Sequence, residues 1–394
     1  MIKNQTRKAN IASIEFWCSI AFFFSLVLND TFGEAPGFHI ISKGVILLFM
    51  ALTAFYIVSR DFKIPISAII LFGSSLLWWI LSALWTDGSV GFLSTLAQNV
   101  LLGFLVYCYF SKFQNYDLLL YAMFFSGFVL IAYSFVVYGV DGFFALLQEE
   151  ERVGEGIANS NTYGRVFSYG ILAGLYLTFY KRKWPCLLGC LLFLGFSLSS
   201  GSRKAILIII IGSLVMLFLR YGLKRPFAFL LASAAVLLIL YAVIQLPMFS
   251  VANERFTMLL EGSSKDYSTN ERNDMIDAAI ELFKQKPVAG WGVEGFADAS
   301  GYGRYCHNNF LEILANYGII GFILYYSIHA YILIKLLTKL NMSNSDCVVM
   351  FTIVLTSLIM DYGNVSYGIK WMWIILGAGL ALAYKSAKEN RKNL

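Results

Sequence analysis

The sequence predicts an all-α fold: a polytopic membrane bundle of about 12 transmembrane helices with one large extracytoplasmic loop. The 394 residues are 58% hydrophobic and only 14% charged, whereas a soluble domain has about 25% charged and 45–50% apolar residues. A mean hydropathy of +0.68 and 16% aromatic residues also exclude a disordered chain. Six cysteines are too few for a secreted disulfide scaffold of this length. We therefore expect residues 1–394 to form a single integral membrane domain.

Uninterrupted apolar stretches indicate where the helices lie, because a spanning helix needs roughly 20 mostly apolar residues. The candidate spans cover approximately residues 12–28, 40–58, 65–85, 90–110, 117–138, 160–180, 184–199, 203–220, 226–246, 307–335, 346–361 and 368–385. The distribution of charge favours this even number.

Charge also orients the spans, because Lys and Arg concentrate on the cytoplasmic side of membrane proteins. With the N-terminus inside, 18 of the 30 basic residues but only 5 of the 24 acidic residues fall on inner segments. Adding or removing one span would destroy this alternation, so both termini are predicted to be cytoplasmic. The net charge of +6 then reflects membrane orientation and gives no support for nucleic-acid binding. The first span is interpreted as an uncleaved anchor.

Two predicted loops are long, and both lie outside. One covers about 139–160, and the larger one covers about 247–306. Within the larger loop, apolar residues at i, i+3 and i+4 spacing predict an amphipathic helix over about 271–286, which lies on the membrane surface or against the bundle. Met275, Ala279 and Leu282 belong to its apolar face.

A glycine-rich stretch, Gly290-Trp291-Gly292-Val293-Glu294-Gly295, follows this helix. It has the letters of a dinucleotide fingerprint, but no strand precedes it and no crossover helix follows it. We expect Gly290 and Gly292 to form a turn whose backbone approaches a ligand or a neighbouring helix.

Two arginines lie near outward-facing helix N-termini, where a basic residue is locally unfavourable. Arg203 begins the eighth span, and Arg272 lies near the start of the loop helix. An anion bound between the helix end and the guanidinium would offset this unfavourable electrostatic interaction. Arginine in particular engages phosphate in a bidentate manner. Two such sites outside the membrane suggest a diphosphate on a lipid carrier. The alternatives are that Arg203 extends to the interface and that Arg272 pairs with Asp274 or Glu271.

Further candidates lie at the starts of the sixth and tenth spans. Arg165 is either a supporting partner of the diphosphate site or the partner of an outer acid. His307 at a helix N-terminus fits a general base, although an interfacial histidine without a catalytic role remains open. Glu312, about one turn into the span, either contacts the acceptor or forms a structural pair. The pair Cys306-His307 lacks a second ligand pair at metal-binding spacing, so no metal is predicted.

At these residues the chain resembles the bacterial O-antigen ligase and O-antigen polymerase family. The resemblance covers about residues 155–325. Its motifs are Leu198-Ser199-Ser200-Gly201-Ser202-Arg203-Lys204-Ala205, then Arg272 leading through Ala278, Leu282 and Phe283 to Pro287-x-x-Gly290-x-Gly292-x-x-x-Phe296, then His307-Asn308-Asn309-Phe310-Leu311 with its continuation Leu314 to Gly321, and a looser element, Asn159–Gly164.

The resemblance implies an inverting, metal-independent glycosyltransferase in the bacterial plasma (inner) membrane, with its active site on the extracytoplasmic face. The donor would be an oligosaccharide on undecaprenyl diphosphate, the acceptor a glycan or lipid-linked glycan, and the product O-antigen, capsule or exopolysaccharide. No cofactor is implied; other polysaccharide-export proteins are possible partners. The loop between Arg272 and His307 is short compared with many ligases, which slightly favours a polymerase.

The resemblance also implies residue roles. Arg203, Arg272 and Arg165 would bind the diphosphate, and His307 and Glu312 would be catalytic. Support of the acceptor or of the loops would come from Asn161, Gly290, Gly292 and Asn308.

Two other functions remain as alternatives. A secondary transporter would suit about twelve spans, but the large loop breaks any six-plus-six symmetry, and the charges gather at the outer face instead of the midplane. A flippase for lipid-linked oligosaccharides would share the substrate but would not need His307 as a base.

Overall fold

The computed structural model describes residues 2–33, 39–59, 64–157, 159–261, 267–340 and 345–392. All regular secondary structure in these ranges is helical, as the sequence predicts. The chain forms two compact units, and each is assembled from three separate parts of the sequence. Unit 1 comprises Met1–Asp61, Phe113–Gly262 and Leu340–Ile353, and unit 2 comprises Phe62–Lys112, Ser263–Lys339 and Val354–Leu394.

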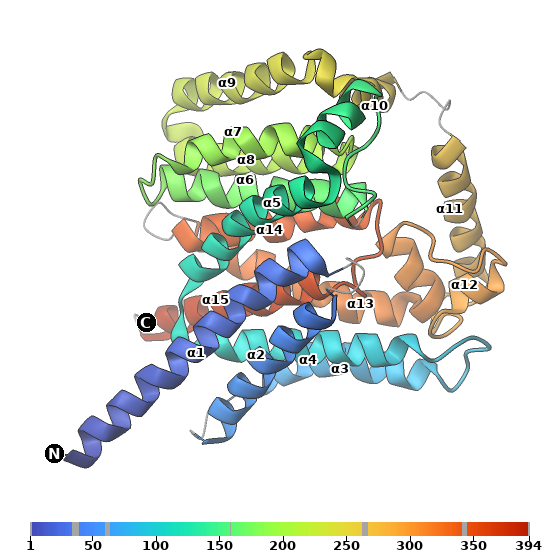
Figure 1. Ribbon diagram of the computed structural model, residues 1–394. Helices are drawn as coiled ribbons and strands as arrows, with labels where there is room; N and C mark the ends of the chain where they lie inside the picture. Colours follow the sequence, from blue (N-terminus) through green and yellow to red (C-terminus); the bar gives the residue numbers. More distant parts are fainter. Residues whose placement is uncertain are drawn as a thin grey trace. The chain divides into compact units, whose positions relative to one another are not determined.

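Unit 1 is built around α6. Its helices are α1 (Ile2–Phe32), α2 (His39–Ser59), α5 (Tyr116–Gln148), α6 (Ser160–Phe179), α7 (Cys186–Ser199), α8 (Arg203–Tyr221), α9 (Pro226–Ile244), α10 (Ser250–Glu261) and the first part of α14 (Ser345–Asp361), with short 3-10 turns η1 (Gly222–Lys224) and η2 (Pro247–Phe249). Helix α6 packs against α5, α7 and α8, and α8 packs against α9 (Figure 1).

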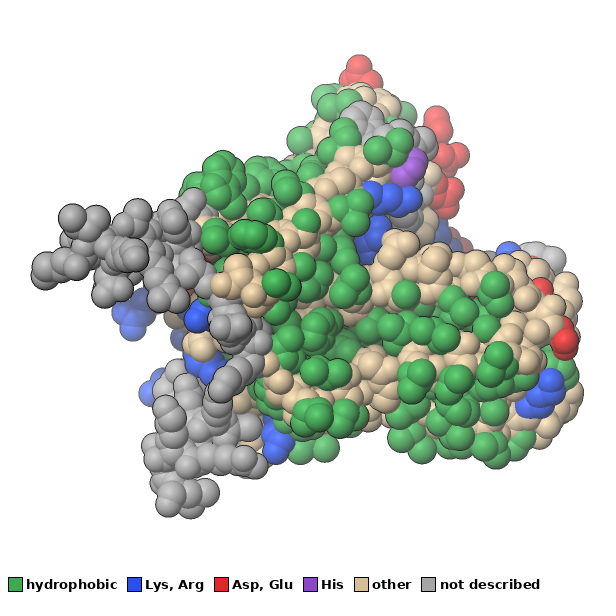
Figure 2. Space-filling view, turned by 90° about the horizontal axis from the view of Figure 1, so that it is seen from below, with side chains coloured by type: hydrophobic (Ala, Val, Ile, Leu, Met, Phe, Trp, Pro, Cys, Tyr) green, Lys and Arg blue, Asp and Glu red, His purple; other side chains and the backbone are tan. Residues whose placement is uncertain are grey.

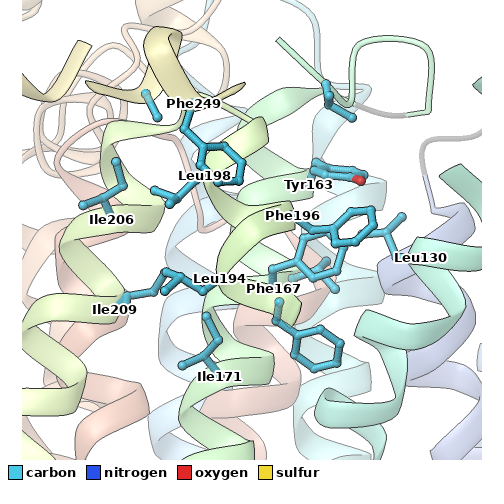
Figure 3. Close-up of a cluster of buried hydrophobic side chains, with 14 of the residues drawn as sticks. Leu130, Tyr163, Phe167, Ile171, Leu194, Phe196, Leu198, Ile206, Ile209 and Phe249 are labelled. Atoms are coloured by element: carbon cyan, nitrogen blue, oxygen red, sulfur yellow. The ribbon is translucent and has the colours of Figure 1, made fainter. Parts of the chain in front are cut away.

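A cluster of buried hydrophobic side chains holds α6, α7 and α8 together (Figure 3). Phe167 of α6 contacts the rings of Phe193 and Phe196 on α7. Leu198 and Ile206 belong to the same cluster and lie on either side of the turn between α7 and α8. This packing fixes the place where Arg203 begins α8.

Unit 2 is built around α13. Its helices are α3 (Ile66–Ser82), α4 (Phe92–Phe113), α11 (Tyr267–Gln285), α12 (Gly295–Ala299), α13 (Asn309–Leu337), α15 (Lys370–Lys392) and the last part of α14. Helices α3, α11, α12 and α15 all pack against α13. Aromatic side chains fill the centre of this unit, where the buried ring of Trp79 contacts Tyr317, Tyr325 and Trp373.

Each of the twelve stretches predicted to span the membrane coincides with a helix. Among the described residues, seven helices are long and apolar enough to cross a membrane by length and composition, and α3 and α7 are shorter apolar helices. Hydrophobic side chains cover much of the face seen in Figure 2, and on α9 Phe227 is 87% exposed and Leu231 is 75% exposed. Such surfaces fit a lipid environment. The count of twelve crossings stays a prediction.

The predicted long loops contain more helix than expected. Helix α5 continues to Gln148 beyond a break at Gly139, where φ is 71°, so much of the predicted loop 139–160 is helical. The loop 247–306 contains α10, α11 and α12 instead of a single helix. Helix α11 begins at Tyr267, not at 271. Its apolar face lies against the protein: Met275, Ala279 and Leu282 are buried in a cluster with Phe296 of α12 and Ala315 of α13.

Candidate functional site

In unit 1, the candidate residues meet at the turn between α7 and α8. Arg203 is the first residue of α8 and is half-buried. The preceding residue, Ser202, occupies the N-cap position, but its hydroxyl donates a hydrogen bond to the Oδ1 atom of Asn161 (3.1 Å) instead of capping α8. The first backbone N–H groups of a helix have no partner within the helix. Arg203 therefore lies at the helix end where the macrodipole favours an anion.

Asn161 thus contacts the turn through its side chain, and its implied role in supporting the acceptor or the loops stays a prediction. It lies in the first turn of α6, whose N-cap residue Asn159 accepts hydrogen bonds from the N–H groups of Asn161 (3.0 Å) and Thr162 (2.9 Å). The side chain of Asn161 is thus held on a capped helix end and reaches Ser202 on the other side of the turn.

Arg165 is buried with an acid. Its guanidinium lies 3.4 Å from the carboxylate of Asp30 on α1, and the side chains of both residues are less than a tenth exposed. Removing one member of a buried ion pair leaves an uncompensated charge. Of the two roles open from the sequence, this pairing favours the one in which Arg165 stabilises unit 1, and we do not assign Arg165 to the diphosphate.

A second arginine lies at the same turn and was not selected from the sequence. The Nε atom of Arg152 donates to the carbonyl oxygen of Ser200 (2.9 Å), and the N–H of Val153 donates to the carbonyl of Ser199 (3.0 Å). These contacts attach the segment after α5 to the C-terminal end of α7, just before the turn into α8. The available signal was a single basic residue directly after Glu149-Glu150-Glu151.

In unit 2, Arg272 lies on the second turn of α11, because this helix begins at Tyr267. The expected position at the helix N-terminus is therefore wrong, since the helix-end effect falls off within the first turn. Arg272 is half-buried. Its neighbour Glu271 forms an ion pair with Arg304 in the segment after α12.

The glycine turn at 290–292 docks onto a break in α13. At Gly318 the backbone leaves the helical conformation (φ 64°, ψ −168°). The N–H groups of Trp291 and Gly292 donate to the carbonyls of Ala315 (2.9 Å) and Asn316 (2.7 Å), and the N–H of Ile319 donates to the carbonyl of Pro287 (2.9 Å). The backbone groups released by the break are thus satisfied by the turn, as buried polar groups in a membrane protein require.

Only glycine fits at the centre of this contact. A Cβ atom on Gly290 would lie 2.4 Å from the carbonyl oxygen of Asn316, and one on Gly318 would lie 2.2 Å from that of Val288. Both residues also have positive φ angles. The expectation that Gly290 brings the backbone close to a neighbouring helix is confirmed, and the neighbour is α13. Beyond the break, Ile319–Leu337 measures about 28 Å, close to the roughly 30 Å of a bilayer core. The short part of α13 before Gly318 is therefore not needed for crossing.

His307 lies just before this short part. It has a φ of 59°, which is uncommon for a residue with a side chain. The next residue, Asn308, is the N-cap of α13, and its Oδ1 atom accepts hydrogen bonds from the N–H groups of Phe310 (3.0 Å) and Leu311 (3.2 Å). The His307 ring is half-buried and meets the edge of the Tyr305 ring at a centroid distance of 4.5 Å. His307 is thus held outside the helix in a defined turn, with Asn308 as its support.

Glu312 fixes the same turn from inside. One carboxylate oxygen accepts the backbone N–H of Cys306 (2.8 Å), and the other accepts the side-chain amide of Asn316 (3.0 Å). Glu312 is only 4% exposed. With both oxygens engaged inside the protein, Glu312 is better described as positioning the His307 turn than as contacting substrate. Cys306 is also buried, and burial raises the pKa of its thiol well above the usual range.

A buried acid that the sequence did not single out holds the other side of α13. Asp361, at the end of α14, accepts hydrogen bonds from the hydroxyls of Tyr326 (2.9 Å) and Ser366 and from the amide of Asn309 (3.2 Å). The Oδ1 atom of Asn309 accepts the N–H groups of Ser366 (2.7 Å) and Tyr367 (3.0 Å). The start of α13, two residues after His307, is therefore bound on both sides. An ionisable residue at the end of an apolar stretch was the signal available in the sequence.

The comparisons with known proteins agree with these motifs. No curated protein matches the chain. Residues 188–326 match the family model described as O-antigen ligase. This segment contains Arg203, Arg272 and His307, whereas Asn161 and Arg165 precede it. The matched segment falls almost entirely within the region of residues 155–325 that carries the resemblance, and the match therefore supports the resemblance to the O-antigen ligase and polymerase family.

Proposed function

We propose that the protein transfers or polymerises oligosaccharide units carried on undecaprenyl diphosphate, at the outer face of the bacterial plasma membrane. The family match gives a membrane polysaccharide ligase or polymerase. The observation that carries the finer proposal is the His307 turn, which is fixed by Asn308 and Glu312 and lies beyond the part of α13 that is long enough to cross the bilayer. A transporter or flippase has no use for an imidazole held in this way.

The leaving group sets the first chemical requirement. When the bond between the anomeric carbon and the diphosphate oxygen breaks, negative charge accumulates on the lipid diphosphate. Preorganised cationic donors stabilise such charge. We assign this role to Arg203 and Arg272, because guanidinium groups bind phosphate oxygens in pairs. The position of Arg203 at the N-terminus of α8 supports its assignment. Arg272 is assigned from the family motif alone.

The acceptor sets the second requirement. A sugar hydroxyl attacks the anomeric carbon from the side opposite the diphosphate, so the configuration inverts. Its proton must pass to a base as the new C–O bond forms. We assign His307 as this base. Glu312 positions His307 by holding the N–H of Cys306, and Asn308 caps the helix that follows.

Reconstitution of the purified protein into liposomes with lipid-linked oligosaccharide tests the proposal. Ladders of increasing length indicate a polymerase, and single transfer to a second acceptor indicates a ligase. Movement of the donor across the bilayer without transfer would show a flippase and would overturn the proposal.

Substitutions test the residue roles. Arg203→Ala, Arg272→Ala and His307→Ala should each abolish transfer while the protein still inserts and folds. Arg272→Lys should also fail, because Lys cannot bind phosphate in a bidentate manner. Lys284→Ala on the same helix is the matched control, since Lys284 is exposed and pairs with Glu281 on the surface. Full activity in all three alanine variants would reject the enzymatic function.

A further inference from the structure

The segment between α12 and His307 presents two tyrosine rings to solvent. We name residues 300–305, Ser300-Gly301-Tyr302-Gly303-Arg304-Tyr305, the tyrosine loop. Residues 301–305 are all exposed; Tyr302 is 38% exposed and Tyr305 is 44% exposed. Aromatic side chains carry a large apolar surface, and a tyrosine adds a polar hydroxyl at its edge. Two such rings in the segment next to the proposed base need an explanation.

The loop is held in one shape by several contacts, while both tyrosine side chains stay partly exposed. The N–H of Gly303 donates to the carbonyl of Ala297 (3.0 Å), and the N–H of Tyr302 donates to the hydroxyl of Ser300 (3.3 Å). The Tyr302 ring stacks nearly parallel on the buried ring of Phe296, with an interplanar angle of 12°. Arg304 is anchored to α11 by its ion pair with Glu271. The rings are therefore preorganised, which reduces the entropy lost when a ligand binds.

The position of Tyr305 relates the loop to the chemistry. Its ring touches the ring of His307, with centroids 4.5 Å apart and planes inclined at 63°. A pyranose packed on the exposed part of the Tyr305 side chain would lie close to the imidazole. The C–H groups on one face of a pyranose pack well on an aromatic ring, while its hydroxyls need polar partners at the edge. Tyr and Arg side chains supply both kinds of contact.

We propose that the tyrosine loop binds the acceptor glycan, with Tyr305 stacking on the sugar that reacts and Tyr302 on a neighbouring sugar. This proposal rests on the proposed function and adds to it where the acceptor lies. The rival explanation for exposed tyrosines in a membrane protein is anchoring at the bilayer interface. The contact between Tyr305 and His307 favours the glycan, because a ring that anchors the loop in lipid has no reason to touch the proposed base.

The test measures binding and turnover separately. The probe is the oligosaccharide released by mild acid from the cell's own lipid carrier, titrated onto the purified wild-type protein and its variants by calorimetry. Loss of one aromatic–sugar contact should weaken binding of this oligosaccharide about tenfold in Tyr305→Ala. Tyr302→Ala should weaken it less. Tyr305→Phe and Tyr305→Trp should stay within about threefold of wild type, because stacking persists.

The same variants are then assayed for transfer with lipid-linked donor. The KM for acceptor should rise about tenfold in Tyr305→Ala, as in binding, while the KM for donor stays unchanged. Tyr241→Ala is the matched control, since Tyr241 is 64% exposed on α9 and should alter neither constant. Unchanged oligosaccharide binding in both Tyr302→Ala and Tyr305→Ala would overturn the proposal. A fall in thermal stability in liposomes with a normal KM for acceptor would also overturn it, because an anchor at the bilayer interface would give that result. Weakened binding in a protein that transfers nothing would keep the glycan site and refute the proposed function.

Discussion

The contact between the glycine turn and the break in α13 makes a sharp prediction for Gly318→Ala. Alanine would have to adopt a positive φ, and its Cβ would lie 2.2 Å from the carbonyl oxygen of Val288. A residue held in such a conformation costs about 1–3 kcal/mol. If the clash displaces the turn, the hydrogen bonds of Trp291, Gly292 and Ile319 are lost as well, each worth about 0.5–1.5 kcal/mol. We expect Gly318→Ala to lower the free energy of unfolding by about 4 kcal/mol.

Thermal unfolding in detergent should show this as a midpoint lower by roughly 5 °C. Hydrogen exchange should speed up at Trp291, Gly292 and Ile319, because their N–H groups lose their acceptors. Gly73→Ala in α3 is the control: nothing lies within 4 Å of a Cβ there, and alanine in a helix interior is neutral or stabilising by about 0.5–1 kcal/mol. If Gly318→Ala unfolds at the wild-type temperature with the amides of Trp291, Gly292 and Ile319 still protected, the contact between the glycine turn and the broken helix is not what stabilises the protein.

Three further predictions concern buried groups. Glu312→Ala removes the carboxylate that accepts the N–H of Cys306 and the amide of Asn316. We expect a loss of about 2–3 kcal/mol in the free energy of unfolding and a fall in kcat, measured by thermal unfolding and by transfer assays. Wild-type values for both would contradict the positioning role. Arg165→Ala should destabilise the protein by about 3–5 kcal/mol, because Asp30 loses its partner. Adding Asp30→Asn to this variant should restore much of the lost stability. A loss of donor binding at wild-type stability would instead assign Arg165 to the diphosphate. Because burial raises the pKa of the Cys306 thiol above its ordinary value of 9.0, the thiol stays protonated in the folded state and its stabilising contribution declines as pH rises beyond that value. With Cys306 as the only cysteine, maleimide at pH 8 should label the protein only after unfolding, and rapid labelling of the folded protein would refute the burial.

The helices could be predicted from the sequence because hydropathy is a local property. An apolar stretch near membrane length leaves its backbone few options other than a helix, so every predicted span lies on one. Helix α10 was missed because hydropathy gives no signal there: Ser250–Glu261 has a mixed composition and no strong apolar pattern. The break inside α13 was not predicted, since Gly318 breaks the helical geometry without interrupting the hydropathy.

The candidate site was predictable as far as residue type and helix polarity allow. Arg203 lies at the start of α8, as expected. The roles of Arg165 and Glu312 depend on partners far along the chain or across a turn, namely Asp30 and the N–H of Cys306, and no local pattern reveals such contacts. Asp361 was overlooked because its function lies in the hydrogen bonds it accepts from two residues of α13 and from Ser366.

The discontinuity of the two units bears on how the protein is made. Unit 1 takes its last part from Leu340–Ile353, where Asp346 accepts a hydrogen bond from Tyr176 on α6 and lies 4.0 Å from Lys181. A ribosome delivers α6 long before α14, and all of the segment matched by the family model is synthesised in the interval. During that time the binding site for the start of α14 on unit 1 must stay open in the bilayer. Neither unit can therefore be completed during translation before the other is nearly finished, and a break in the chain after residue 339 would leave both of them incomplete.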